Sequence, residues 1–233
     1  MTVPTLPDRV GDAIVARGMN SLHVTGVGLV TKLDGRGGSP DPSTYRDELV
    51  EIMKRHDIAA PKVLLESTNN ALVRIRASIP PGARRGDRID VAVESPVDAN
   101  ANDLSNGWLL EARLALQTRV KGSLGRTEVK GGKTAAIAKG PVLSRTQHTV
   151  YSDDSNGRSG HVIGGAIVQE DREISLKIGE SYAHKHNAEK LAKAINQRFK
   201  FFDGISREGI AKPTRDDSIE LRLHPRYHHN PSR

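Results

Sequence analysis

The chain has 233 residues, no cysteine, a formal net charge of +7 at pH 7 and a sequence pI of about 9.7. This length suits one large domain or two small ones, and the missing cysteines exclude disulfides, thiolate metal sites and cysteine nucleophiles. A basic balance is typical of proteins that meet nucleic acid, anionic lipid or an acidic polymer, but it equally suits a solvated surface.

The N-terminal region shows neither a membrane span nor an export signal. No apolar run approaches the roughly 18 residues of a spanning helix. The first residues lack a basic stretch followed by an apolar one, so no signal peptide is visible. The sequence alone therefore indicates either a cytosolic protein or a mature or trimmed chain.

The first clear elements are a strand and a helix separated by a turn-rich loop. Residues Val24–Leu33 read as a strand, and Asp34–Pro42 read as a loop because Gly, Pro, Ser and Asp dominate it. Thr44 opens a helix, and Asp47 stands three residues on, as in a capping box. One face of this helix gathers Tyr45, Leu49, Ile52, Met53 and His56.

Two alternating runs around a Pro-Pro-Gly turn give the clearest strand signal. Residues 73–79 and 89–93 place apolar side chains at every second position. Two further short apolar runs begin at Trp108 and Thr134. Between them lies "KGSLGRTEVKGGK", interpreted here as a flexible basic loop.

The C-terminal third predicts a strand–helix–strand unit. Residues 146–161 are polar and rich in turn formers, whereas "VIGGAIVQED" after them reads as a short strand near a glycine turn. Residues 174–178 form the next strand, and residues from Ser218 alternate again. Between them Asn187 caps a helix whose apolar face is formed by Ala188, Leu191, Ala194, Ile195 and Phe199.

These elements predict a mixed α+β fold that is rich in β structure and ends in a strand–helix–strand module. We expect a β-rich α+β domain over 1–145 with one helix near 44–56. Residues 146–161 are expected to be a polar linker or surface loop, and residues 162–233 to form the strand–helix–strand module.

Two glycine-rich stretches resemble phosphate-binding loops, and both fail at a required glycine. The dinucleotide pattern G-x-G-x-x-G starts at Gly26 and Gly28, but its third glycine would be Thr31. The P-loop ending "GGKT" would need a glycine where Thr127 stands. We therefore expect Gly26 and Gly28 to serve close packing or a bulge, and Gly35, Gly37 and Gly38 to supply positive φ in the loop.

No constellation for catalysis, metal binding or cofactor binding stands out. His184 and His186 are two positions apart at an expected helix start, so they point to different faces. His228 and His229 lie in a polar tail, and no G-x-S-x-G elbow occurs. The sequence predicts no catalytic residue, no metal ligand and no cofactor.

Basic residues in the expected loops are the candidate contact residues. Between residues 121 and 145 only Glu128 opposes the cationic side chains. Such a surface could face an acidic partner. The residues expected to face a partner are Arg84, Arg85, Lys121, Arg126, Lys130 and Lys133.

The order of the segments resembles the flagellar basal-body P-ring protein family of Gram-negative bacteria. The most specific match is "IPPGARRGDRIDVAVES" to the family pattern L-P-P-x-A-x-x-G-x-R-I-D-V-x-V-S-S. In collinear order stand "RVGDAIVARGMNSLHVTGVGLVTKLDGRGG", "SNGWLLEARLAL", "AAIAKGPVL", "VIGGAIVQE" and the helix "AEKLAKAINQRF". The glycine pair that the family usually has near residue 107 is reduced to Asn106–Gly107.

The resemblance implies a structural role and no enzyme activity, and it makes the late strand–helix–strand unit a ring-building-like module. Proteins of this family are exported to the periplasm, where many copies close into a ring around the flagellar rod and act with the outer-membrane L ring as a bushing in flagellum-dependent motility. The implied partners are further copies of the chain, the rod, the L-ring protein and peptidoglycan, which the basic residues could contact.

Two other functions remain open at this point. One is a basic module that binds an acidic polymer, peptidoglycan or nucleic acid. The other, ranked below it, is a nucleotide-dependent enzyme.

Overall fold

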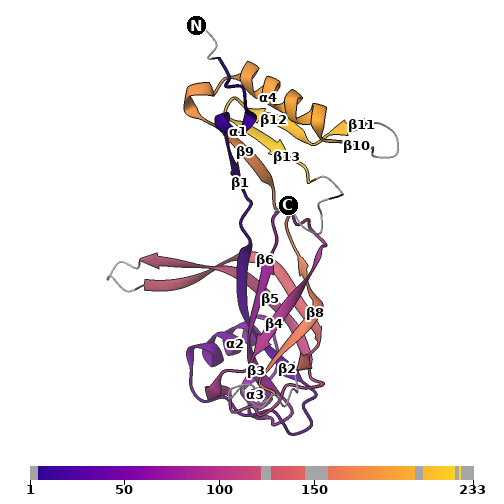
Figure 1. Cartoon of the computed structure of the whole chain (residues 1–233). Coiled ribbons are helices and arrows are strands. Elements are labelled where there is room, and N and C mark those ends of the chain that lie inside the picture. The colour runs from indigo at the N-terminus through magenta and orange to yellow at the C-terminus, as the bar shows by residue number, and fades with distance from the viewer. Residues whose placement is uncertain (1–4, 122–126, 145–156, 203–206, 224–225, 227–233) are drawn as a thin grey trace, which may run out of the picture. The chain divides into compact units, whose positions relative to one another are not determined.

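The computed structural model describes residues 5–121, 127–144, 157–202, 207–223 and 226 (Figure 1). The chain folds into two compact units, and neither is continuous in sequence. The barrel unit comprises Leu22–Ile79 and Arg85–Glu170. The terminal unit comprises Met1–Ser21, Pro80–Arg84 and Asp171–Arg233.

Six antiparallel strands of the barrel unit close on themselves. Their order is β4-β3-β2-β5-β6-β8, and β8 pairs again with β4 (Figure 1). A short strand, β7 (Leu143–Ser144), adds to β8. The six barrel strands are β2 (Leu22–Thr31), β3 (Ala71–Ile79), β4 (Arg88–Glu94), β5 (Trp108–Lys121), β6 (Thr127–Pro141) and β8 (Ser159–Val168).

The alternation along β3 and β4 decides which side chains fill the barrel. Val73, Ile75, Ala77 and Ile79 are buried, whereas Arg76 and Ser78 between them are exposed. Small residues stand on the far wall, with Ala112 on β5 and Ala136 and Ala138 on β6 all buried. The interior is therefore packed by side chains.

Gly26 and Gly28 face this interior, and neither has room for a side chain. A Cβ on Gly28 would lie 2.7 Å from Cδ1 of Ile75, and one on Gly26 would meet the carbonyl oxygen of Arg113 on β5. These glycines let β2 approach β5 closely. The expectation of close packing is thus confirmed by the geometry.

Two helices cover the outer face of β2 and β3. They are α2 (Thr44–Arg55) and α3 (Pro61–Glu66). Their apolar side chains join those of the strands in one cluster, which contains Val27, Leu29, Leu49, Met53, Leu65, Leu72 and Ala99. Ala99 lies in the 3-10 turn η1 (Val97–Ala99).

The predicted first helix is confirmed, with its cap one residue earlier than expected. Ser43, not Thr44, is the N-cap, and its Oγ accepts a hydrogen bond from the backbone N–H of Arg46 at 3.4 Å. Helix α3 is an element that the sequence analysis missed. Only six residues long, it begins at Pro61 and is too short to show a helical period.

The loop between β2 and α2 is fixed by backbone hydrogen bonds. The N–H of Gly37 donates to Thr68 O at 2.7 Å, and that of Gly38 donates to Asn70 O at 3.1 Å. Gly35 has the expected positive φ of 85°. The expectation of positive φ is wrong for Gly37 and Gly38, where glycine is needed because a Cβ would collide with neighbouring backbone oxygens.

The terminal unit is a four-stranded antiparallel sheet with a helix on one face. The sheet order is β1-β9-β13-β12, and the helix is α4 (Lys185–Arg198) (Figure 1). Its strands are β1 (Ile14–Arg17), β9 (Ile174–Ile178), β12 (Ala211–Arg215) and β13 (Ser218–Leu221). Smaller elements complete it: α1 (Val10–Ala13), η2 (Glu180–Tyr182) and the hairpin β10 (Lys200–Phe202) with β11 (Arg207–Gly209).

The core of this unit lies between α4 and the sheet. It contains Ala13, Leu176, Ile178, Ala188, Leu191, Ala192, Ala211 and Ile219. The predicted buried face of the helix is confirmed at Ala188 and Leu191, but Ala194 is exposed. The N-cap of α4 is His184, whose Nδ1 accepts from the N–H of His186 at 3.2 Å.

Asn187 was expected to be the cap and has a different role. It is 1% exposed, and its Nδ2 donates a hydrogen bond to Tyr182 O at 3.2 Å. A capping residue and a residue in the first turn look alike in sequence because both bond to nearby backbone. The side chain here ties α4 to η2, which precedes it.

The β-rich α+β class is confirmed, and the compact units differ from the sequence-based division at 146–161. Within that stretch, residues 146–156 lie outside the described part of the chain. Strand β8 begins at Ser159 and belongs to the barrel, whereas residues 1–21 group with the C-terminal sheet. The strand–helix–strand module of β9, α4 and β13 is present and is completed by β1 from the opposite end of the sequence.

Candidate partner-contacting surfaces

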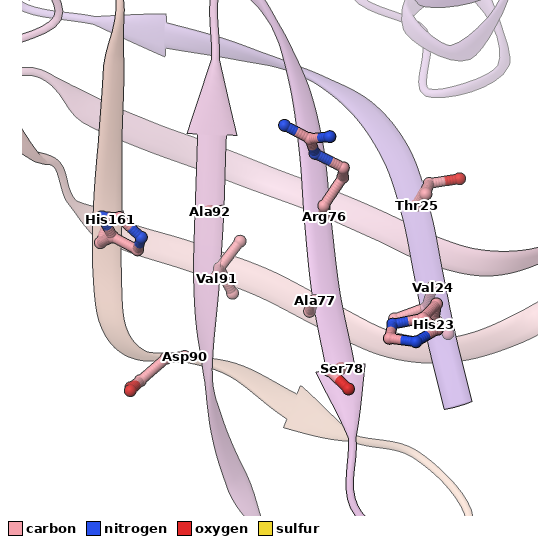
Figure 2. A pocket seen from close by; sticks show the side chains of 10 residues that line it. All are labelled: His23, Val24, Thr25, Arg76, Ala77, Ser78, Asp90, Val91, Ala92 and His161. Atoms are coloured by element: carbon pink, nitrogen blue, oxygen red, sulfur yellow. The ribbon is translucent and has the colours of Figure 1, made fainter. Parts of the chain in front are cut away.

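The solvent-facing side chains of four barrel strands line a shallow concavity of about 380 Å³ (Figure 2). Strand pairing places Thr25, Arg76, Ala92 and His161 in one row across β2, β3, β4 and β8. His23 and His161 lie at opposite sides of the concavity in Figure 2. Within the described residues, no three His, Cys, Asp or Glu side chains are grouped so that they could hold a metal ion.

Asp90 and Arg88 on β4 fix a bend in β8. The backbone N–H of Gly164 donates to Asp90 Oδ1 at 2.6 Å, and Arg88 donates to Gly164 O at 3.3 Å. Gly164 has a φ of 55°, which favours glycine. Asp90 therefore has a structural partner.

A second and larger cavity, of about 640 Å³, lies beside the N-terminal half of α2. Its wall contains three arginines from β3 and β5, with Glu48 and Tyr45 from the helix. We call it the arginine cavity; the arginines are Arg74, Arg76 and Arg113.

Glu94 on β4 bridges two of these arginines. Its Oε2 lies 2.9 Å from Arg74 Nη2 and 2.6 Å from Arg76 Nη2. Arg74 also donates to the hydroxyl of Tyr45 at 3.5 Å. The hydrogen bond from Arg74 lowers the pKa of Glu94 against the opposing effect of burial, and the same bond raises the pKa of Arg74.

The pKa of Glu48 is shifted upward, in the opposite direction to that of Glu94. Although the residue as a whole is exposed, burial of its carboxyl raises its pKa, and the nearby positive charge of Arg55 acts to lower it. Sequence reasoning missed this group of residues. The available signal was the alternation that puts Arg74 and Arg76 on the wet face of β3.

The predicted contact residues are spread over the structure. Arg84 and Arg85 are exposed in the segment between β3 and β4. Lys133 forms an ion pair with Glu170. Arg126 lies outside the described residues, and Lys121 and Lys130 belong to the long hairpin of β5 and β6.

The prediction of a flexible loop over 121–133 is wrong for most of that range. Residues 127–133 belong to β6, and Lys121 pairs with Thr127 across the hairpin. In Figure 1 the far ends of β5 and β6 run together beyond the other barrel strands. Glycine and lysine are uncommon in strands, so the composition of this stretch did not indicate a strand, although the partner strand is only a few residues away.

Neither glycine motif forms a phosphate-binding turn. Gly131, Gly132, Lys133 and Thr134 lie within the antiparallel strand β6, which continues to Pro141. Gly26 and Gly28 lie inside β2. A phosphate-binding loop needs a strand-to-helix turn that exposes backbone N–H groups. Both stretches instead lie in paired strands.

Residues 9–233 match the family model of the flagellar P-ring protein. The chain belongs to the flagellar P-ring protein family. A flagellar P-ring protein from Thermotoga maritima is 32% identical over 200 residues, which cover 82% of this chain and 55% of the relative. The relative from Fervidobacterium nodosum is 32% identical over 91% of this chain, and that from Geobacter metallireducens 26% over 97%.

The matches cover most of this chain but a smaller share of each relative. The chain spans about half to two thirds of the length of the P-ring proteins it matches, from 55% to 63% in these three. The P-ring family is a family of structural proteins, not of enzymes. No helix among the described residues is long and apolar enough to cross a membrane.

Proposed function

We propose that the chain is a structural subunit of the P ring of the bacterial flagellar basal body. In this role, copies of the chain form a periplasmic ring around the rod and act with the L ring as part of the bushing for rotation. The observation that carries the proposal is the family match over residues 9–233.

The terminal unit supplies the element that we assign to ring closure. A ring of identical subunits needs a head-to-tail interface between two different surfaces. Strand β12, at one sheet edge, carries Pro213 with Lys212 and Arg215, a combination that protects an edge from pairing. Strand β1, at the other edge, presents Val15 with 66% of its surface exposed. We therefore assign β1 to the subunit contact.

Ring formation by the whole protein tests this proposal. The protein, with the flanking part present in its relatives, should sediment as large closed assemblies at high concentration. Val15→Asp should reduce the assembled fraction severalfold, because a charge at the contact must be desolvated. Val63→Asp on α3 is the matched control, since Val63 is also 66% exposed. A wild-type protein that stays monomeric would contradict the proposal.

The basic residues are proposed to contact peptidoglycan or another acidic partner. They are Arg84, Arg85, Lys121, Arg126, Lys130 and Lys133. Their support is in the sequence, where only Glu128 opposes the cationic side chains between residues 121 and 145. Contacts of this kind weaken as salt screens them.

Sedimentation with purified peptidoglycan across a salt series measures this contact. We expect binding at low salt that is lost at about 0.5 M salt, where the screening length is only a few ångströms. Replacing Lys121, Arg126 and Lys130 by glutamine should reduce the bound fraction. A triple variant of the exposed lysines of α4, Lys185, Lys190 and Lys193, removes the same charge and should retain binding. Absence of binding at low salt would refute the assignment.

A further inference from the structure

The arginine cavity contains more positive charge than the chain itself neutralises. Glu94 is shared by Arg74 and Arg76, and Arg113 has no hydrogen-bond or ion-pair partner among the described residues. With Glu48 included, three guanidinium groups face two carboxylates. The volume, about 640 Å³, is far larger than one bound ion requires.

Two buried polar atoms at this cavity also lack partners. They are Oγ1 of Thr25 and Nε of Arg74, and neither has a hydrogen-bond partner in the described part of the chain. Both residues line the cavity. Buried polar groups are nearly always paired in native proteins, so these two side chains leave hydrogen-bonding capacity unused in the wall of the cavity.

The arginine cavity adjoins an apolar cavity of about 350 Å³. The two share Val27 and Arg113, and they follow each other along α2. Tyr45 and Glu48 line the first, and the next residues of the helix line the second. The large apolar side chains in its lining are Leu29, Leu49, Ile52, Met53, Ile58 and Leu110. Three polar side chains, those of His56, Glu111 and Arg113, also line it.

We propose that this pair of cavities binds a segment of another protein that carries a carboxylate next to an apolar side chain. The carboxylate accepts hydrogen bonds from the exposed guanidinium group of Arg113. The apolar side chain enters between α2 and β5, where Ile58 and Leu110 are 40% and 42% exposed. A free inorganic anion would leave the apolar cavity empty, and an uncharged peptide would leave Arg113 unpaired.

A fluorescent peptide tests the proposal with the full chain. The probe is a terminally blocked peptide with two leucines followed by two glutamates, and its binding is followed by fluorescence anisotropy at low salt. The control peptide has glutamines in place of the glutamates and should bind about tenfold more weakly, as expected for loss of a charge-assisted contact.

Two substitutions separate the charged and apolar parts of the site. Arg113→Gln should weaken binding of the glutamate peptide about tenfold and leave the control peptide unchanged. Leu110→Gln should weaken both peptides. Lys62→Gln, at an exposed position of α3, removes one positive charge away from the cavities and should change the binding of neither peptide. Thermal unfolding of each variant verifies that it is folded.

Three results would overturn the proposal. The first is equal binding of both peptides, and the second is an unchanged affinity in folded Arg113→Gln. The third is full displacement of the peptide by millimolar inorganic phosphate in an Arg113-dependent manner, which would define a free-anion site. The site belongs to the barrel unit alone, so a chain that binds the peptide but forms no ring would refute the proposed function and leave this inference intact.

Discussion

Replacing Gly26 by alanine is expected to destabilise the barrel unit by about 3 kcal/mol, at the upper end of overpacking effects. The added Cβ would collide with the carbonyl oxygen of Arg113 and lie 3.0 Å from Cδ2 of Leu114. A carbonyl in a paired strand cannot rotate away as a side chain can. Urea unfolding measures the change, with the fluorescence of Trp108, the one tryptophan of the chain, reporting on β5.

Gly11→Ala provides the control for this substitution. Nothing lies within 4 Å of a Cβ at Gly11, and its φ is not positive. Its stability should therefore change by less than about 0.5 kcal/mol. If Gly26→Ala unfolds at the same urea concentration as the wild type, β2 does not approach β5 as closely at Gly26 as described.

Asn196→Ala is expected to cost the terminal unit about 3 kcal/mol, the sum of two buried backbone groups left without partners. Nδ2 of Asn196 donates to Ala211 O at 2.7 Å, and the N–H of Ala211 donates to Oδ1 of Asn196 at 2.8 Å. Ala211 is 6% exposed, so water cannot replace the amide. One helix side chain thus replaces a strand neighbour at the start of β12.

Hydrogen exchange measured by mass spectrometry is suited to this variant because it reports on each unit separately. Peptides that cover β12 and β13 should exchange faster in Asn196→Ala, and barrel peptides should be unchanged. Asn196→Asp keeps the acceptor for Ala211 N–H but loses the donor. The exchange rate of its β12 and β13 peptides should therefore lie between those of the wild type and Asn196→Ala. Gln197→Ala, at an exposed neighbouring position, should match the wild type. Equal exchange in all four proteins would contradict the role assigned to Asn196.

The sequence predicted the strands and helices that carry a strong period. Residues 73–79 alternate so regularly that both the strand and its buried face follow from the pattern. Barrel closure could not be predicted, because alternation tells which face of a strand is buried but not which strand lies beside it. The pairing of β4 with β8 joins Val93 to Gly160, 67 positions away in the chain, and nothing local encodes it.

The candidate surfaces were predicted less completely than the fold. Composition identified basic residues, and the alternation placed Arg74 and Arg76 on the wet side of β3. The meeting of these arginines with Tyr45 and Glu94 depends on α2 packing over the barrel and on the register of β3 with β4. The contribution of β1 to the terminal sheet was missed for the same reason, since its partner β9 lies about 160 residues further along the chain.

Electron microscopy of basal bodies shows whether the chain is a subunit of the P ring. Cells that lack the gene are compared with cells that express the whole protein, wild type or Val15→Asp. We expect no P ring and no motility without the protein, a complete ring and motility with the wild type, and few rings with Val15→Asp. Basal bodies that keep a normal P ring in the absence of this protein would contradict its assignment as the ring subunit.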